Sequence, residues 1–191
     1  MNFLAHLYLS GNSEGLLIGN FIADSVKGKA YENYNQEIQK GILLHRKIDT
    51  FTDSHPIVSQ SKQRLYSRYH KYSPVVVDIF YDHFLAVKWN NYSTVSLNEF
   101  AENSYRLMNT NFEILPEKIK FMLPYMIKGN WLVNYSNVEG IRKTLTGMSR
   151  RTSFNSGMET ATEILVQHYS LFENEFELFF EELKNYVKTI E

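Results

Sequence analysis

The residues of this chain that are best suited to chemistry are its aspartates and histidines, and they gather in one part of the sequence. Of 21 acidic residues only five are aspartates, and none of these lies in the second half of the chain. Glutamate is the usual surface acid of a helix, because it tolerates a helix interior better than aspartate does. Aspartates inside helical patterns therefore indicate a role other than solvation. The aspartates are Asp24, Asp49, Asp53, Asp78 and Asp82, and the nearby histidines are His6, His45, His55 and His83.

Two pairs among them have the i, i+4 spacing that places side chains on one face of a helix. His45 and Asp49 form one pair, and Asp78 and Asp82 form the other. At about 100° per residue both pairs fall on the apolar stripe of their segments, as His45 does beside Ile42. A buried carboxylate is costly unless it is paired, hydrogen-bonded or bound to a metal ion. The two inward-facing pairs therefore need an explanation.

Three explanations compete for these aspartates. Asp53 lies near a predicted helix end, where a capping role is sufficient. Asp49 or Asp82 could instead form a buried ion pair, for which Arg46 and Lys88 are the available cations. The third explanation is a metal ion, because histidine nitrogens and carboxylate oxygens without sulfur suit manganese, magnesium, iron or zinc in a hydrolytic site. Such an ion activates water and offsets the charge of a phosphate.

Helix signals that could position these residues recur along the whole chain. Capping residues, prolines in first turns and glycines after last turns mark the segments. Neither an alternating strand pattern nor a long linker interrupts them, so the sequence predicts one all-α domain over residues 1–191, a compact bundle of about seven to nine helices. The predicted segments are 3–9 after Asn2, 13–28, 35–52, one from Pro56, one from Pro74, one from Ser96, one from Pro116, one from Asn137 that ends at Gly147, and a long one from Ser156 to Val187.

The composition excludes several classes of protein. The chain has no cysteine, which excludes disulfides, thiolate metal sites and cysteine nucleophiles. Its formal net charge of −1 at pH 7 excludes bulk attraction to nucleic acid. No stretch approaches the roughly 18 uninterrupted apolar residues of a membrane span, and no secretory signal is apparent at the start. We therefore expect a cytoplasmic protein that binds neither nucleic acid nor membrane.

Two stretches of the chain carry basic residues and no acid. Solvated helix faces are the simpler interpretation. The alternative is a docking surface for an acidic partner. Residues 54–77 hold Lys62, Arg64, Arg68 and Lys71, and residues 140–158 hold Arg142, Lys143, Arg150 and Arg151.

Several segments together resemble the acyl carrier protein phosphodiesterase family, whose members remove the 4′-phosphopantetheine arm from holo-acyl carrier protein. The resemblance covers about residues 1–155 in order, and the combined pattern is specific although each piece alone is weak. The C-terminal helix carries no such motif. The segments are MNFLAHLYLS at 1–10, GNFIADSVKG at 19–28, GILLHRKIDTFTD at 41–53, DIFYDHFLAVKW at 78–89, WLVNY at 131–135 and LTGMSRR at 145–151.

This resemblance implies a divergent branch of the all-helical HD-type metal phosphohydrolases. Their histidine and aspartate ligands surround one or two divalent ions, and the resemblance implies Mn²⁺ here, with Mg²⁺ or Fe²⁺ as alternatives. The sequence shows Asp82-His83 in reversed order where the wider superfamily has His-Asp. The implied ligands are His6, Asp24, His45, Asp49, Asp82 and His83, with Asp78 as a reserve ligand or a group that orients a histidine.

The implied reaction cleaves the phosphodiester between a carrier serine and phosphopantetheine. Asp24 is a catalytic candidate, and Asp49 is a candidate acid for the departing serine oxygen. Arg46 and Arg150 or Arg151 are candidates for binding phosphate oxygens, because the guanidinium group matches them in a bidentate fork. Acyl carrier proteins are acidic, so the two basic stretches are the expected docking surfaces. The alternatives are a small phosphoester or nucleotide as substrate, and a non-catalytic helical module that binds a carrier protein.

Overall fold

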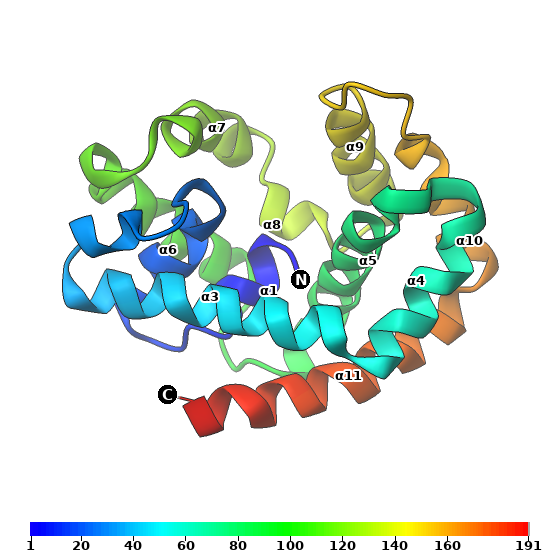
Figure 1. The fold of residues 1–191 in the computed structure, drawn as a ribbon, viewed down its shortest axis with the longest axis horizontal. Helices are drawn as coiled ribbons and strands as arrows, with labels where there is room; N and C mark the ends of the chain where they lie inside the picture. The colour runs from blue at the N-terminus through cyan, green and yellow to red at the C-terminus, as the bar shows by residue number, and fades with distance from the viewer. Residues whose placement is uncertain (191) are drawn as a thin grey trace.

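The computed structural model describes residues 1–190, and over that range it confirms the all-α prediction. Short 3-10 segments join the α-helices, no strand occurs among the described residues, and Figure 1 shows the helices gathered into one body. The HD-type arrangement stays a prediction. The helices are α1 (Phe3–Tyr8), α2 (Glu14–Ile22), α3 (Gln36–Ser54), α4 (Pro56–Tyr69), α5 (Ser73–Val87), α6 (Leu97–Thr110), α7 (Glu117–Lys128), α8 (Trp131–Asn134), α9 (Val138–Ser149), α10 (Ala161–Gln167) and α11 (Tyr169–Ile190).

Local sequence signals explain most of the helix starts. A capping side chain satisfies backbone N–H groups that have no partner within the first turn of a helix. Five predicted segments begin with such a cap, in which the side-chain oxygen accepts a hydrogen bond from a backbone N–H. The capping residues are Asn2, Ser13, Asn35, Ser96 and Asn137.

Several predicted helix boundaries are wrong. Helix α9 continues through Gly147 and ends at Ser149, because a glycine inside a helix only weakens it. The capping box predicted between Ser156 and Glu159 does not form, because both side chains bind Ser149 instead. Ser156 Oγ donates to Ser149 Oγ at 2.9 Å, and Ser149 Oγ donates to the Glu159 carboxylate at 2.6 Å. The long C-terminal helix is broken at His168 into α10 and α11. This break and the short α8 raise the number of helices above the predicted seven to nine.

Helices α2 and α3 pack with their backbones in contact, because glycine faces glycine between them. A Cβ atom on Gly19 would lie 2.2 Å from the carbonyl oxygen of Ile38, and one on Gly41 would lie 2.5 Å from the carbonyl oxygen of Leu16. Only glycine leaves room for this approach. The next turn of α3, which carries His45, is thereby held against α2.

Replacing Gly41 by alanine is expected to lower the free energy of unfolding by about 2–3 kcal/mol, because the new methyl group presses on the backbone of α2. Gly147→Ala in α9 is the matched control, since its Cβ would meet nothing within 4 Å. That control is expected to raise the stability by up to about 1 kcal/mol. Urea unfolding measures both variants. Equal stabilities for the two would contradict the close packing of α2 on α3.

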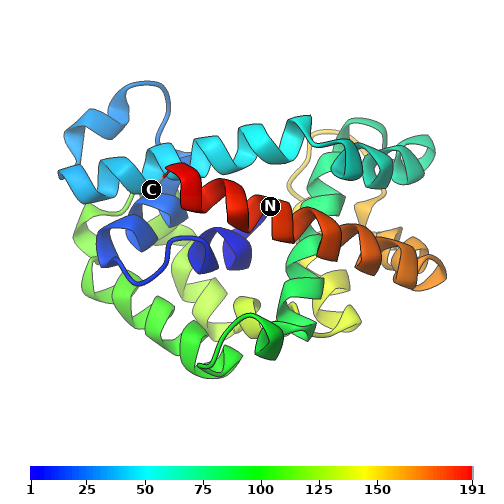
Figure 2. The ribbon, with the colours of Figure 1, turned by 90° about the horizontal axis from the view of Figure 1, so that it is seen from below.

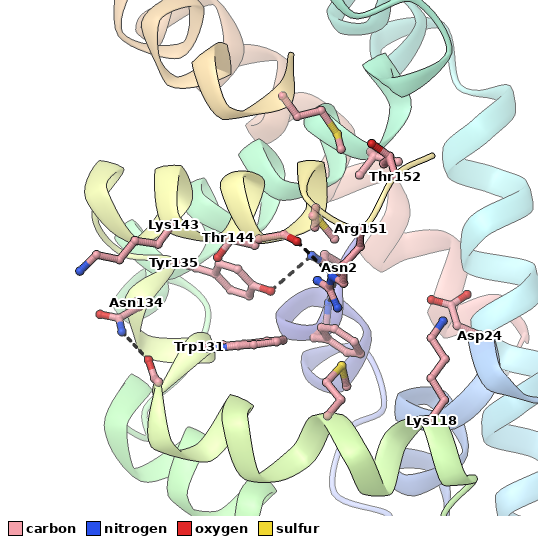
Figure 3. Close-up of a pocket in the computed structure, with 18 of the residues that line it drawn as sticks. Asn2, Asp24, Lys118, Trp131, Asn134, Tyr135, Lys143, Thr144, Arg151 and Thr152 are labelled. Carbon is pink, nitrogen blue, oxygen red and sulfur yellow. Dashed lines mark hydrogen bonds between the residues drawn. The ribbon is translucent and has the colours of Figure 1, made fainter. Parts of the chain in front are cut away.

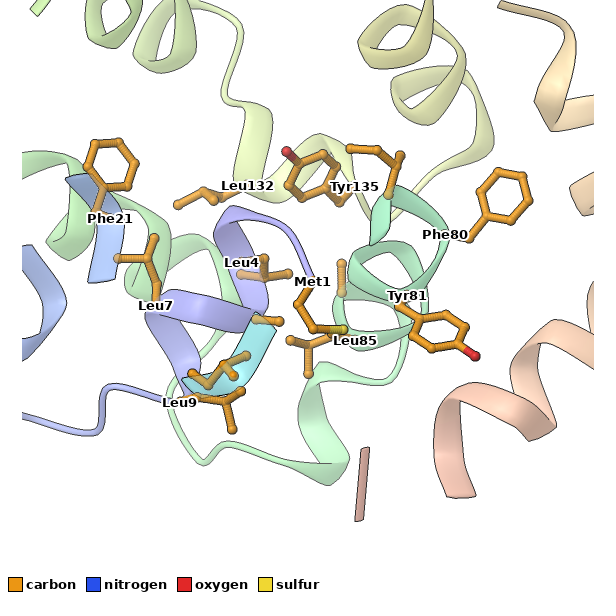
Figure 4. Close-up of a cluster of buried hydrophobic side chains, with 14 of the residues drawn as sticks. Met1, Leu4, Leu7, Leu9, Phe21, Phe80, Tyr81, Leu85, Leu132 and Tyr135 are labelled. Atoms are coloured by element: carbon orange, nitrogen blue, oxygen red, sulfur yellow. The ribbon is translucent and has the colours of Figure 1, made fainter. Parts of the chain in front are cut away.

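The short helix α1 lies inside the hydrophobic core, and this explains how a histidine of α1 is buried. Leu4 and Leu7 of α1 pack among side chains such as Leu85 of α5 and Leu132 of α8 (Figure 4).

Helix α11 runs along one side of the molecule and packs against α3, α4 and α5 (Figures 1 and 2). The described residues include no helix that is both long and apolar enough to cross a membrane.

Candidate metal centre

Three of the expected ligands converge where α1 meets α3. His6 comes from α1, and His45 and Asp49 come from successive turns of α3. The Oδ1 atom of Asp49 lies 3.2 Å from Nε2 of His6, and its Oδ2 atom lies 3.1 Å from Nε2 of His45. The two imidazole rings stack with their centroids 3.8 Å apart. One possible ligand atom from each residue lies within 4.8 Å of the other two, which is close enough for the three side chains to hold one metal ion.

Asp24 adds a second carboxylate beside this cluster. The helix predicted over residues 13–28 ends at Ile22, and Asp24 lies in the 3-10 segment η1 (Ala23–Ser25) that follows. Its Oδ1 atom lies 3.4 Å from Nε2 of His45, while 70% of its side chain is exposed. Asp24 is therefore the member of the group that is most open to solvent and to a substrate.

Asn20 orients the ring of His45 and holds the backbone of His6, and it was not among the predicted site residues. Its side chain is fully buried and donates hydrogen bonds to the carbonyl oxygen of His6 at 2.8 Å and to Ser10 Oγ at 2.9 Å. The carbonyl oxygen and Oδ1 of Asn20 lie 2.9 and 3.0 Å from Nδ1 of His45. Nδ1–H therefore donates to Asn20, which leaves Nε2 of His45 free to bind a ligand. The sequence signal for Asn20 is an amide side chain within the apolar pattern of α2, directly after Gly19.

His6 is a buried polar side chain with unsatisfied nitrogens. Its ring is 3% exposed, and neither ring nitrogen makes a hydrogen bond of acceptable geometry, although Nε2 lies close to Asp49. A buried polar atom without a partner costs about 1–3 kcal/mol. A metal ion bound to His6 would remove this cost. Because two imidazole nitrogens and carboxylate oxygens suit hard or borderline divalent cations such as Mn²⁺, the residues fit the expected ion.

The charges in the cluster are strongly coupled. Burial disfavours a charged His45, but the adjacent carboxylates of Asp24 and Asp49 outweigh burial and raise its pKa to about 9. Burial and the positive charge of His45 together lower the pKa of His6 to about 4. Burial also opposes ionisation of Asp49, yet the two histidines hold its pKa well below the usual range. Asp49 is thus a carboxylate near neutral pH, which favours a ligand over the proton donor that the sequence analysis considered.

The structure does not bring Asp78 and Asp82 into this cluster. Asp82 is completely buried and accepts hydrogen bonds from three backbone N–H groups at the start of α1, at 3.2, 2.7 and 3.3 Å. Burial raises its pKa to about 7. Asp78 pairs with the terminal amine of Met1 at 2.9 Å. Both carboxylates hold the beginning of α1 in place, and they contribute to the cluster by positioning His6.

His83 also has partners elsewhere. Its Nδ1 atom lies 2.7 Å from the carbonyl oxygen of Tyr135, and its Nε2 atom lies 2.9 Å from the hydroxyl group of Tyr169. Burial lowers the pKa of His83, which favours the neutral ring. The neutral ring then donates from Nδ1 and accepts at Nε2. Both nitrogens are occupied, so the structure leaves no free ligand atom on His83.

The predicted phosphate-binding arginines take different places. Arg46 donates hydrogen bonds to the carbonyl oxygens of Val26 at 2.8 Å and Gly28 at 2.9 Å, and so fixes the loop that follows η1. A cavity bounded by α7, α8 and α9 adjoins the cluster at Asp24. Arg151 lines this cavity, whereas Arg150 does not. Of the pair at the end of α9, Arg151 is therefore the one placed to meet a substrate.

Most of the predicted docking residues are paired within the chain. The guanidinium group of Arg64 donates to both oxygens of a glutamate of α11, at 2.8 and 2.7 Å. Arg68 pairs with a glutamate of α10 at 2.9 Å, and Arg142 pairs with one of its own helix at 2.7 Å. Lys71 lies 4.6 Å from the centroid of a phenylalanine ring. Within residues 1–190, Lys143 makes no ion pair, and it lines the cavity.

A cavity of about 660 Å³ adjoins the cluster (Figure 3). Its walls come from the start of α1 and from α7, α8 and α9. Among residues 1–190, Asp24 is the one acidic residue that lines it, and Lys118, Lys143 and Arg151 are its cations. The cavity therefore combines an electropositive lining with direct access to the carboxylate that lies beside His45.

Comparison with known proteins shows the family of the chain. The family model described as acyl carrier protein phosphodiesterase matches residues 1–183. A relative with that name from Photorhabdus laumondii is 33% identical over 94% of this chain and 91% of its own length. One from Pectobacterium atrosepticum is 32% identical over 99% of this chain and 98% of its own length. One from Escherichia coli O157:H7 is 32% identical over 94% of both chains. No solved structure matches the chain. The chain belongs to the acyl carrier protein phosphodiesterase family.

Proposed function

We propose that this chain is a metal-dependent phosphodiesterase that releases 4′-phosphopantetheine from the serine of holo-acyl carrier protein. The names of its relatives support the substrate class. The observation that carries the metal dependence is the buried His6 ring, whose nitrogens lack hydrogen bonds and lie beside His45 and Asp49. Mn²⁺ is the proposed ion, with Mg²⁺ or Fe²⁺ as alternatives. The cytoplasmic location stays a prediction.

His6, His45 and Asp49 would hold the ion, and Asp24 lies close enough to His45 to join them. When bound, the ion lowers the pKa of a water molecule and neutralises phosphate charge. Asn20 holds the His45 ring with Nε2 towards Asp24 and Asp49, where it would bind the ion. Asp24 is an exposed carboxylate beside the ligands, and it is placed to orient the attacking water.

The proposed reaction is a hydrolysis at phosphorus. The oxygen of one water molecule adds to phosphorus, and the bond between phosphorus and the serine oxygen breaks. The serine oxygen takes up a proton, and the phosphate stays on pantetheine. Lys118 and Arg151 line the adjoining cavity and are placed to offset negative charge on the phosphate oxygens (Figure 3).

Intact-mass spectrometry of holo-acyl carrier protein tests this function. We expect the carrier to lose the mass of its phosphopantetheine arm when the enzyme and Mn²⁺ are present, and to keep it when EDTA is added. The released 4′-phosphopantetheine should appear in the filtrate. An intact carrier after incubation with Mn²⁺, Mg²⁺ and Fe²⁺ in turn would contradict the proposal. Cleavage of a small phosphodiester under conditions that leave the carrier intact would favour the small-substrate alternative.

A further inference from the structure

We propose that the cavity between α7, α8 and α9 binds the pantetheine arm of the substrate, with the phosphate at its Asp24 end and the carrier protein outside. The inference rests on the proposed function and adds which part of the substrate enters the chain.

The cavity and the metal-ligand cluster meet at one residue. Asp24 lines the cavity, and its Oδ1 atom lies 3.4 Å from Nε2 of His45. Figure 3 shows the side chain of Lys118 at the same end of the cavity as Asp24. A phosphate placed there touches the cluster on one side and a cation on the other. The group attached to that phosphate can then extend into the cavity.

The charge of the cavity suits an anionic ligand. Among residues 1–190, three cations line it, Lys118 from α7, Lys143 from α9 and Arg151 from the turn after α9, against one acid. None of the three makes an ion pair with any residue of the described part of the chain, so their charges are not neutralised internally. Arg151 donates from Nε to the carbonyl oxygen of Gly147 at 3.1 Å, which fixes the start of its guanidinium group and leaves the terminal nitrogens for a ligand.

The walls of the cavity match the chemistry of pantetheine. This arm alternates a geminal dimethyl group and short methylene segments with a hydroxyl group and two amides, and it ends in a thiol. Phe3, Met122, Trp131 and Met148 offer apolar, adaptable surface, and the hydroxyl group of Thr144 offers a hydrogen bond. The volume of about 660 Å³ falls within the roughly 300–1,000 Å³ of small-molecule sites. A folded carrier protein is far too large to enter, so it must remain on the outside.

This orientation has a consequence for the products. With the arm enclosed, the serine oxygen departs towards solvent together with the carrier protein. The phosphate and the arm form the second product, 4′-phosphopantetheine, which stays in the cavity after cleavage. Free 4′-phosphopantetheine should therefore bind the enzyme and compete with holo-acyl carrier protein.

Gly147 allows the cavity to be filled without disturbing the fold. It lines the cavity from within α9, and a Cβ atom added there would meet nothing within 4 Å. The variant Gly147→Phe places an aromatic ring in the proposed site of the arm. Thr146→Phe is the matched control, since the same ring is added at the preceding position of α9, which does not line the cavity. Thermal unfolding verifies that both variants are folded.

Isothermal titration with 4′-phosphopantetheine, in the presence and absence of Mn²⁺, tests the inference without any turnover. We expect Gly147→Phe to bind at least about tenfold more weakly than the unmodified chain, and Thr146→Phe to bind like it. In turnover the same loss should appear in KM more than in kcat. Equal affinities for all three chains, or an affinity no better than that of inorganic phosphate, would overturn the inference.

Trp131 supplies a second measurement that needs no stable filled variant. The chain has two tryptophans, and Trp89 is buried in the core while Trp131 lines the cavity. Binding of 4′-phosphopantetheine should change the tryptophan emission, and Trp131→Phe should lose that change. An unchanged emission at saturating ligand would count against the cavity as the site. If holo-acyl carrier protein is not hydrolysed at all, the proposed function fails, yet both binding measurements still decide where the ligand binds.

Discussion

Replacing Asp49 by asparagine is expected to lower kcat/KM for holo-acyl carrier protein by at least about 10³-fold, which corresponds to roughly 4 kcal/mol of transition-state stabilisation. The carboxylate of Asp49 lies against both His6 and His45, at 3.2 and 3.1 Å, so its loss removes a charged ligand from the centre of the proposed metal site. An asparagine keeps the shape of the side chain and removes its charge. Because Asp49 also pairs with the buried ring of His45, thermal unfolding verifies that the variant is folded.

Asp53→Asn is the matched control for this variant. Asp53 lies one turn further along α3, 72% of its side chain is exposed, and it pairs with Lys62 at 2.8 Å. The same change of charge on the same helix should leave activity as it is, since Asp53 pairs with Lys62 and is not among the possible ligands. Steady-state kinetics and the manganese content of each purified chain measure the difference. Activity of Asp49→Asn within about tenfold of the unmodified chain would contradict a ligand role for Asp49.

Replacing Glu175 by glutamine is expected to lower the free energy of unfolding by about 2–4 kcal/mol. Glu175 of α11 is 9% exposed and accepts two hydrogen bonds from Arg64 and one from Ser61, both of α4. A glutamine keeps only one of the two carboxylate oxygens as an acceptor. It also leaves the partly buried guanidinium group of Arg64 without its counter-charge. The same ion pair uses donors of Arg64 that the predicted docking role would need, so that role stays a prediction.

Glu163→Gln provides the comparison on the surface. Glu163 of α10 pairs at 2.9 Å with Arg68, which lies in α4 as Arg64 does. The side chain of Glu163 is 64% exposed and that of Arg68 is 46% exposed. Exposed ion pairs contribute roughly 0–1 kcal/mol because water and salt screen them. Urea unfolding should therefore separate the two glutamate variants clearly. If both lost the same stability, the contribution of the buried pair would be no larger than that of the exposed one.

The sequence predicts local features of the fold well, because the interactions that produce them are local. A cap such as Ser96 satisfies a backbone N–H three residues away, and the spacing of His45 and Asp49 places them on one face of a helix whatever surrounds it. The break between α10 and α11 depends on contacts with other helices, which no local pattern encodes. The break lies at His168, where the sequence has no glycine or proline of the kind that marks a helix end.

Helical phase shows that a residue is buried, but it does not show which partner it meets. Asp82 was correctly placed on an inward face, yet its partners are backbone groups of α1, 77 to 80 residues earlier in the chain. Asn20 was missed for the same reason, because its importance lies in contacts with α1 and α3 rather than in its own helix. The sequence thus predicts which residue types gather at the candidate site, whereas only the structure separates the candidate metal ligands from the carboxylates that hold the start of α1.

An anomalous difference map from a crystal of the chain soaked in Mn²⁺ tests the central claim most directly. The proposed centre predicts one strong peak at the manganese edge within bonding distance of Nε2 of His6, Nε2 of His45 and an oxygen of Asp49, and the loss of that peak in Asp49→Asn. A peak beside Asp82 and His83 instead, or no peak in a crystal whose protein cleaves holo-acyl carrier protein, would contradict it.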